Sequence, residues 1–395
     1  MKLSQRKYFQ FLIKTKNDSG IILLTVLWVL VILSSLAIGL SRATNIELAL
    51  TKQAVGEIRA KYLAWGGLIY AVNQIRLDSE DKESNAWDTL YQCGISPSLN
   101  LPTEEVFATK TLKDGSFYIR YQERSEPLEA AVSSTEIGET YQKNVPVVNI
   151  IQKSTGTYYK DYIGLQDEER KLNINGLTPQ NYPILSSLIE VLGFDDEIAE
   201  TIALSILDWK DEDALPSDPA KGAEDDYYEE QDRPYKCKNA PFDSLEELRL
   251  VRGMTKEIFQ ALSDYLTIFP KDGAFQINFD TASPVVLKAV MRSLSGPVTN
   301  TSPGDADSLV GKLIEYRRGE DGLEFTSDDQ VIEQDQMSLN SPERILFLVA
   351  NQYRTKQSHY LRVRVTGVEE NLKTVSTIDA VVQRDDLAIV AWRRY

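Results

Sequence analysis

The chain has 395 residues, with 43 Lys or Arg against 59 Asp or Glu and a formal net charge of −16. This length accommodates two or three packed domains, because one hydrophobic core rarely grows much beyond ~200 residues. The excess of acid disfavours a nucleic-acid partner, because duplex affinity comes mainly from cations that neutralise phosphates. One histidine (His359) and two cysteines (Cys93 and Cys237) exclude His-rich zinc centres, thiolate zinc cages and iron–sulfur clusters.

The N-terminus combines a basic leader, residues 1–20, with an apolar run at 21–40 that contains no charged residue. Twenty helical residues at ~1.5 Å rise span ~30 Å, the thickness of a bilayer's hydrocarbon core. The basic leader should stay in the cytoplasm, which sends everything after Arg42 across the membrane. A cleaved secretory signal fits poorly, because the run is too long and no A-x-A site follows it. An uncleaved signal anchor remains an alternative.

Beyond the apolar run, hydrophobic residues continue at spacings of three or four, and the first proline of the chain is Pro97. This period is typical of an amphipathic helix. We therefore expect one helix over residues 21–75, transmembrane at 21–40. The recurring positions after the membrane segment are Ile46, Leu50, Ala54, Ile58, Tyr62, Trp65 and Ile69.

The rest of the chain has strand-like segments at both ends and a helical block between them. Residues 107–123 predict a hairpin around Asp114–Gly115, and residues 145–175 are rich in Val, Ile and Tyr. Strand-like residues return from His359 to the C-terminus, whereas 172–348 has helical periodicity. The sequence therefore predicts an α+β fold in which a sheet domain, 76–171 plus 349–395, is interrupted by a helical domain, 172–348.

The helical block contains a weak internal repeat. Thr178-Pro179 and Ser283-Pro284 each predict a helix start, with Ser or Thr as cap and Pro in the first turn. Arg252-Gly253 predicts a turn between two further helical stretches. The pattern resembles tandem helix-hairpin-helix units, which often bind DNA backbone. A packing module is favoured over a DNA reader, because the block is strongly acidic and its turns lack a lysine cluster.

An acidic loop at 208–232 contains eleven Asp or Glu and only two Lys. Carboxylates this dense repel one another unless a cation holds them, and prolines and a glycine keep the loop from being one helix. Calcium suits such a loop, because it takes six to eight hard oxygen ligands and tolerates irregular geometry. The EF-hand spacing is absent. A solvated acidic loop without an ion is the alternative.

The leader that ends in glycine directly before an apolar helix resembles the class III signal of type IV pilins and type II secretion pseudopilins. The resemblance implies that a prepilin peptidase cuts after Gly20 and methylates Ile21. Most members have glutamate at the fifth mature position, where this chain has Thr25. An unpaired carboxylate in hydrocarbon costs about 2.5–3.5 kcal/mol, whereas threonine can bond to its own helix. A subunit without the glutamate is expected at a filament end.

Several motifs, in the right order over nearly the whole chain, resemble the minor pseudopilin K family of type II secretion: KLNIN, LDWKDED, GAEDDYY, KNAPFDSLEELRLVRGM, INFDTASPVVL and a closing AWRR. The resemblance implies a pilin-like antiparallel sheet with a large inserted helical domain, and one or two structural Ca²⁺ ions in the acidic loop. The implied ligands are Asp211, Asp213, Glu224 and Asp225, followed by Asp208 and Asp226. The second acidic segment, 319–330, is a weaker candidate and is expected to be a surface turn.

The resemblance further implies a non-enzymatic subunit at the pseudopilus tip, in complex with the minor pseudopilins I and J and other pseudopilus subunits. Such a subunit supports export of folded proteins across the outer membrane. It would be anchored in the inner membrane by one helix, with most of the chain in the periplasm and no nucleic acid bound.

Three further expectations concern single residues and rival functions. A Cys93–Cys237 disulfide could persist outside the cytoplasm and is slightly favoured over two separate thiols. His359 is expected to be a surface or packed residue. The rivals are a membrane-anchored helix-hairpin-helix DNA receptor and an anchored hydrolase with the acidic loop as metal centre. The hydrolase lacks the histidines and the nucleophile motif that it would need.

Overall fold

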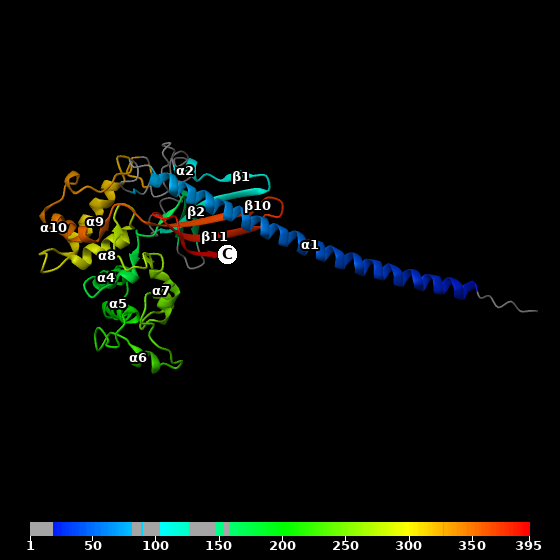
Figure 1. Ribbon diagram of the computed structural model, residues 1–395, viewed down its shortest axis with the longest axis horizontal. Helices are drawn as coiled ribbons and strands as arrows, with labels where there is room; N and C mark the ends of the chain where they lie inside the picture. Colours follow the sequence, from blue (N-terminus) through cyan, green and yellow to red (C-terminus); the bar gives the residue numbers. More distant parts are fainter. Residues whose placement is uncertain (1–18, 81–87, 90–102, 126–146, 153–157, 327) are drawn as a thin grey trace, which may run out of the picture. The chain divides into compact units, whose positions relative to one another are not determined.

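The computed structural model describes residues 19–80, 88–89, 103–125, 147–152, 158–326 and 328–395 (Figure 1). The chain divides into two compact units, 1–58 and 59–395, with the boundary inside the long helix α1. α1 comprises Ser19–Glu80 and thus continues beyond the predicted end near residue 75. Most of the basic leader, residues 1–18, lies outside the described residues.

The first unit consists of the N-terminal part of α1. Among the described residues, this is the one helix whose length and apolar composition allow it to cross a membrane. Its apolar side chains are exposed in the isolated chain, as a lipid-facing helix requires. The Thr25 hydroxyl donates a 2.8 Å hydrogen bond to the Ile22 carbonyl. The expected bond of threonine to its own helix is confirmed.

The second unit contains an eight-stranded antiparallel sheet among its described residues. Six strands follow one another in the order β12-β11-β10-β2-β4-β3, while β1 pairs with β2 and β5 with β10. The central pairing joins the two ends of the unit, because Val365 of β10 lies opposite Ile119 of β2. The strands are β1 (Lys110–Leu112), β2 (Gly115–Ser125), β3 (Val147–Gln152), β4 (Tyr158–Ile163), β5 (Gln166–Asp167), β10 (Tyr360–Glu369), β11 (Val375–Gln383) and β12 (Ile389–Arg394).

The C-terminal part of α1, from residue 59, packs on one face of this sheet. Buried residues recur along it at helical spacing and share a core with strands β2, β10 and β11. The approach is close, because a Cβ on Gly367 would meet the Ala60 carbonyl oxygen at 2.3 Å. The sheet domain therefore includes helix residues that the sequence prediction, with a start at 76, assigned to the preceding helix. The buried apolar residues on this part of the helix include Ala60, Leu63, Ala64, Leu68, Ala71 and Ile75.

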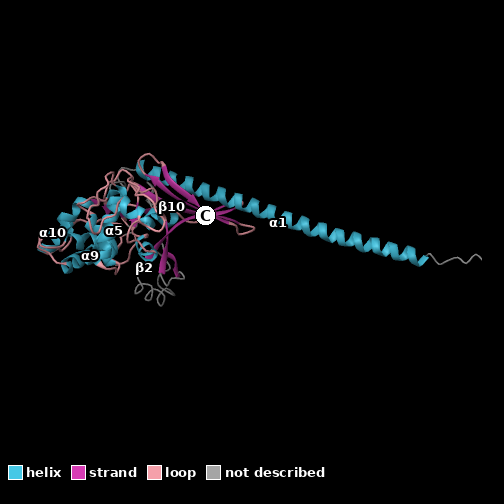
Figure 2. Ribbon diagram, turned by 90° about the horizontal axis from the view of Figure 1, so that it is seen from below, coloured by secondary structure: helices cyan, strands magenta, loops and turns pink. Residues whose placement is uncertain are grey.

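Between β5 and β10 the chain forms a helical block that has its own hydrophobic core. Figure 2 shows the helices of this block beyond one end of the sheet. Two short parallel strand pairs, β6 (Leu172–Asn173) with β7 (Leu266–Thr267) and β8 (Ile277–Asn278) with β9 (Arg354–Thr355), tie the block together. The α-helices of the block are α4 (Tyr182–Val191), α5 (Asp196–Lys210), α6 (Asp225–Glu229), α7 (Lys256–Leu262), α8 (Pro284–Leu294), α9 (Pro303–Arg317) and α10 (Ser341–Ala350). Four 3-10 helices lie in the same region: η2 (Ile174–Gly176), η3 (Leu245–Leu250), η4 (Gln334–Gln336) and η5 (Asn351–Tyr353). One short α-helix lies outside the block, α2 (Thr103–Val106). The predicted α+β class, with a helical insertion in an antiparallel sheet, is confirmed.

Local signals in the block were predicted with mixed success. Ser283 caps α8 by accepting from the Val286 N–H, with Pro284 in the first turn, as predicted. The helix start predicted at Thr178-Pro179 is wrong, because α4 begins at Tyr182. Asn181 instead closes a turn by accepting from the Thr178 N–H at 2.6 Å, which keeps the preceding residues out of the helix.

Two predicted local features of the sheet domain are confirmed. β1 and β2 form the expected hairpin, with Leu112 opposite Gly115. His359 is partly exposed and lies 3.3 Å from the Asp385 carboxylate. It is a surface residue, as expected.

Candidate metal centre

The acidic loop is organised by Asp208, in the last turn of α5. Its side chain is completely buried, and its two oxygens accept hydrogen bonds from the backbone N–H groups of Ser217 (2.8 Å) and Ala223 (2.7 Å). These bonds fold the loop back onto the helix end. Gly222 is needed there, because a Cβ at this position would meet an Asp208 oxygen at 2.3 Å.

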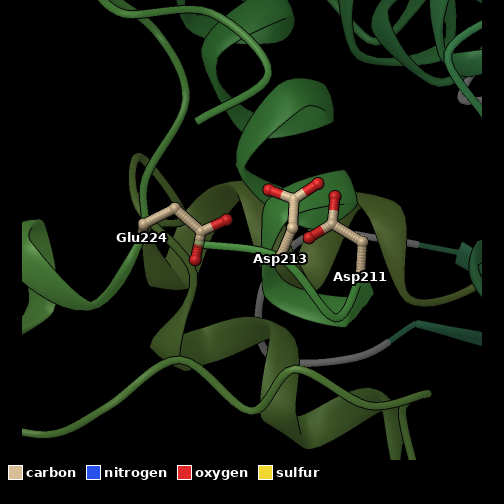
Figure 3. Close-up of side chains that lie close together, drawn as sticks. All are labelled: Asp211, Asp213 and Glu224. Carbon is tan, nitrogen blue, oxygen red and sulfur yellow. The ribbon is translucent and has the colours of Figure 1, made fainter. Parts of the chain in front are cut away.

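This folding brings together three carboxylates, Asp211, Asp213 and Glu224, which we call the acidic cluster. One oxygen from each lies within 4.8 Å of the others. Figure 3 shows the carboxylates of Asp211 and Asp213 next to one another, with that of Glu224 directed toward them from the returning strand of the loop. Asp211 is the C-cap of α5 and Glu224 the N-cap of α6, so the ends of two helices fix the two outer members.

The cluster concentrates negative charge that the described protein groups do not neutralise. Burial, followed by the repulsion of neighbouring carboxylates, raises the pKa of Asp211 to about 6 and that of Glu224 to about 7. Both Glu224 oxygens and one Asp211 oxygen are buried without a hydrogen-bond partner among the described groups. Unpaired buried carboxylate oxygens are costly, so this arrangement favours a bound cation.

The lysines near the cluster have partners elsewhere. Lys210, adjacent to Asp211 in sequence, donates to the carbonyls of Asn175 and Leu177. Lys236 pairs with Asp225 at 3.2 Å. An external cation is therefore the simplest way to balance the cluster.

The donor set fits calcium. Three carboxylates supply up to six hard oxygens, and the cluster contains neither nitrogen nor sulfur ligands, which softer metals prefer. Asp211, Asp213 and Glu224 would hold the ion, with the remaining positions filled by backbone oxygens and water.

The other predicted ligands lie outside the cluster. Asp225 accepts from the Cys237 N–H at 2.8 Å and pairs with Lys236. Asp226 is exposed, and Asp208 is occupied with the loop backbone. The second acidic segment is a turn in which Asp328 accepts the N–H groups of Glu320 and Asp321.

Two contacts of the loop were not predicted. The Arg252 guanidinium, beside the predicted turn at Gly253, donates to the carbonyls of Gly222 (2.7 Å) and Ala220 (2.9 Å). It also lies over the Tyr227 ring, 4.8 Å from the centroid. The cation at this helical turn thus ties the acidic loop to the helices. No local sequence signal links residues about thirty positions apart.

Cys237 is buried at the end of the loop, and burial raises the pKa of its thiol to about 12. Its Sγ donates to the Asp208 carbonyl at 3.4 Å, which connects it to the residue that organises the loop. Cys93 lies outside the described residues, so its pairing with Cys237 stays a prediction.

Comparison with known proteins assigns this region to a family. Residues 170–271, which include the whole acidic loop, match the family model for type II secretion system (T2SS) protein K. This part of the chain is therefore similar to the type II secretion system protein K family. The resemblance given by the sequence motifs is thereby confirmed.

Protein K relatives and one solved structure are similar to this chain. The protein K of Pseudomonas aeruginosa is 27% identical over 172 residues, 42% of this chain and 46% of the relative. That of Aeromonas hydrophila is 36% identical over 111 residues, 27% of this chain and 33% of the relative. The matched stretches thus span less than half of these relatives.

A chain of the crystallised GspK-GspI-GspJ complex from the enterotoxigenic Escherichia coli type 2 secretion system has a similar fold. The TM-score is 0.53 at 16% identity, and the match covers 89% of this chain and 99% of that one. At this identity the likeness shows the fold alone.

Proposed function

We propose that this protein is a minor pseudopilin that caps the tip of the type II secretion pseudopilus together with minor pseudopilins of the I and J types. In that position it supports export of folded proteins across the outer membrane. The observation that carries the proposal is the protein K domain at 170–271, inserted in an antiparallel sheet against which a long, N-terminally apolar helix packs. The solved relative of similar fold comes from a GspK-GspI-GspJ complex, which supports the choice of partners.

The size of the helical block supports a position at the end of the filament. A pilin-like filament packs its long helices side by side, and each subunit must leave room for the next one above and below it. The block between β5 and β10 comprises most of residues 168–359 and has its own core. A helical block of this size would clash with neighbouring subunits in the shaft of the filament, whereas no further subunit lies beyond the tip.

The remaining parts of the proposal concern the membrane and the metal. The inner membrane holds residues 21–40, the bulk of the chain faces the periplasm, and a prepilin peptidase cuts after Gly20 and methylates Ile21. Thr25 suits a terminal subunit because its hydroxyl is satisfied within α1 and needs no neighbour. Calcium at the acidic cluster holds the loop between α5 and α6, so its role is stability and not chemistry.

The partner assignment is tested with the full chain in detergent, mixed with I- and J-type minor pseudopilins of the same organism. We expect one ternary complex on size-exclusion chromatography, and we expect deletion of the gene to stop secretion of type II substrates. The major pseudopilin serves as the control and should not replace the I-type subunit. A chain that stays monomeric with both partners, in cells that still secrete, would contradict the proposal.

Processing is tested separately by mass spectrometry of the native N-terminus. We expect the native chain to begin at N-methylated Ile21. A Gly20→Ala variant should keep its leader and migrate as a chain ~2 kDa heavier. A native chain that begins at Met1 would indicate a plain signal anchor and remove the class III assignment.

A further inference from the structure

Within residues 59–395, a groove of about 610 Å³ lies between the sheet and the helical block. Its sheet side is formed by β2, β4 and β10. Its other side is formed by η3, α7, α8 and the end of α9. The groove lies apart from the acidic cluster, whose residues do not line it.

The groove is basic although the chain is acidic. Nine Lys or Arg and four Asp or Glu line it, in a chain with a net charge of −16. The strand period explains part of this charge, because residues two apart on a strand share a face. Arg362 and Arg364 on β10 line the groove in this way, as does Arg124 on β2.

Some of these cations are committed to the fold. Arg170 pairs with Glu123 at 2.6 Å, and Arg362 pairs with Glu168 and with Asp379. The side chains of Arg170, Glu168 and Asp379 in these pairs are almost fully buried. These pairs fix the shape of the groove and leave little charge for a ligand.

Other cations remain accessible along the groove walls. The side chain of Arg364, 38% exposed, also pairs with Asp379 at 2.8 Å, and that of Arg393, 53% exposed, pairs with Glu246 at 3.1 Å. Arg124 on β2 and Lys288 on α8 are partly exposed and face the groove from opposite sides. Tyr159 bridges the two walls, because its hydroxyl donates to Asp264 at 3.0 Å.

We propose that this groove binds an extended, acidic polypeptide segment of a protein partner. Carboxylates spaced along a strand-like peptide match cations that are distributed along two walls, and the arginine fork is complementary to a carboxylate. Tyrosines and apolar side chains such as Phe259 and Val285 supply contact area between the charges. A nucleic acid is disfavoured, because its dense phosphates would be repelled by the rest of this acidic chain. The inference goes beyond the tip function and does not depend on it.

The test uses the full chain in detergent and a fluorescein-labelled peptide of about ten alternating Glu and Ala residues, long enough to follow a strand. Fluorescence anisotropy should show saturable binding that weakens as salt is added. Arg124→Glu with Lys288→Glu should weaken binding about tenfold or more. Lys113→Glu with Lys256→Glu changes the net charge equally on exposed residues outside the groove and should leave the affinity unchanged.

A second measurement uses the unaltered chain, so it does not depend on the folding of a variant. A photo-crosslinking form of the same peptide should attach to residues that line the groove. Three results would overturn the proposal: no binding of the Glu peptide, equal weakening by both pairs of substitutions, or displacement of the peptide by inorganic phosphate or anionic vesicles. The last result would assign the groove to phosphate or to lipid headgroups.

Discussion

Two regions of this protein bury carboxylates, and they balance the charge differently. At the junction between sheet and helical block, Asp167, Glu168 and Glu169 are all nearly inaccessible. Asp167 accepts from the Thr281 hydroxyl at 2.6 Å and from Asn278 at 3.2 Å. Burial would raise the pKa of Glu168, but the charges of Arg362 and Lys171 outweigh it and hold that pKa below its usual range.

In the acidic cluster, the described protein groups offer no such partners. Glu224 has two buried oxygens without a hydrogen bond, whereas no side-chain oxygen of the three junction residues is in that condition among the described groups. The comparison teaches that carboxylate density alone does not predict a metal site. A metal site is favoured where the surrounding chain provides no hydrogen-bond donors to the buried carboxylates.

The largest effect should follow from removing a cation at the junction. Arg362→Met leaves Glu168 and Asp379 buried without their shared partner, so we expect a loss of about 3–5 kcal/mol in unfolding free energy. Urea denaturation measures this loss. Arg394→Met, at an exposed position on the edge strand, should change stability by no more than about 0.5 kcal/mol. Equal effects of the two substitutions would show that the junction charges carry no special weight.

The acidic cluster should respond to calcium, whereas the junction should not. Calcium at about a hundred times its Kd adds about 2.7 kcal/mol of stability, and a chelator removes it. Asp213→Ala with Glu224→Ala should abolish this shift in melting temperature. Asp226→Ala with Glu230→Ala, on exposed residues of the same loop, should preserve it. If the unaltered protein melts alike with calcium and with chelator, the loop is merely solvated.

Gly222→Ala tests whether Asp208 shapes the cluster. The new Cβ would meet the Asp208 carboxylate at 2.3 Å and displace the loop, at a cost of about 2 kcal/mol and with weaker calcium binding. Gly311→Ala, in α9 with open space around it, is the control and should be neutral or slightly stabilising. Calorimetric titration with calcium separates the two variants. Unchanged calcium affinity in Gly222→Ala would contradict the organising role of Asp208.

The last prediction concerns pH at the junction. Burial and the charge of Asp167 raise the pKa of Glu169 from 4.5 to about 8. Between pH 4.5 and 8 the folded state therefore keeps a proton that the unfolded chain releases. The contribution of this protonation to stability is complete below pH 4.5 and declines as the pH rises toward 8. One such group changes stability by at most about 1.4 kcal/mol per pH unit. Glu169→Gln mimics the protonated form, so its melting temperature should fall less between pH 6 and 8. Parallel curves for both proteins would contradict the assignment.

The sequence predicted those features that depend on local pattern. The period of α1, the Asp114–Gly115 hairpin and the Ser283 cap each follow from neighbouring residues. The approach of Asp211, Asp213 and Glu224 was expected from carboxylate density and family resemblance, and the structure brings these three together.

Features that depend on residues far apart in the sequence were not predicted. The role of Asp208 depends on backbone groups nine and fifteen residues away, and Arg252 acts on carbonyls of a loop about thirty residues earlier. Residues 60–75 showed an amphipathic helix, but nothing in their period revealed that the sheet covers it. Such contacts arise from tertiary packing, which the short-range periodicity of a sequence does not reveal.

The pairing of β2 with β10 has a consequence for biogenesis. These neighbouring strands are separated by more than two hundred residues, so the sheet has a high contact order and cannot close until the C-terminus has emerged. The helical block, with its own core and parallel ties at both ends, can form earlier and bring the two strands near one another. Until then the edge of β2 that pairs with β10 stays unpaired, and such an edge makes an unfinished chain prone to aggregation.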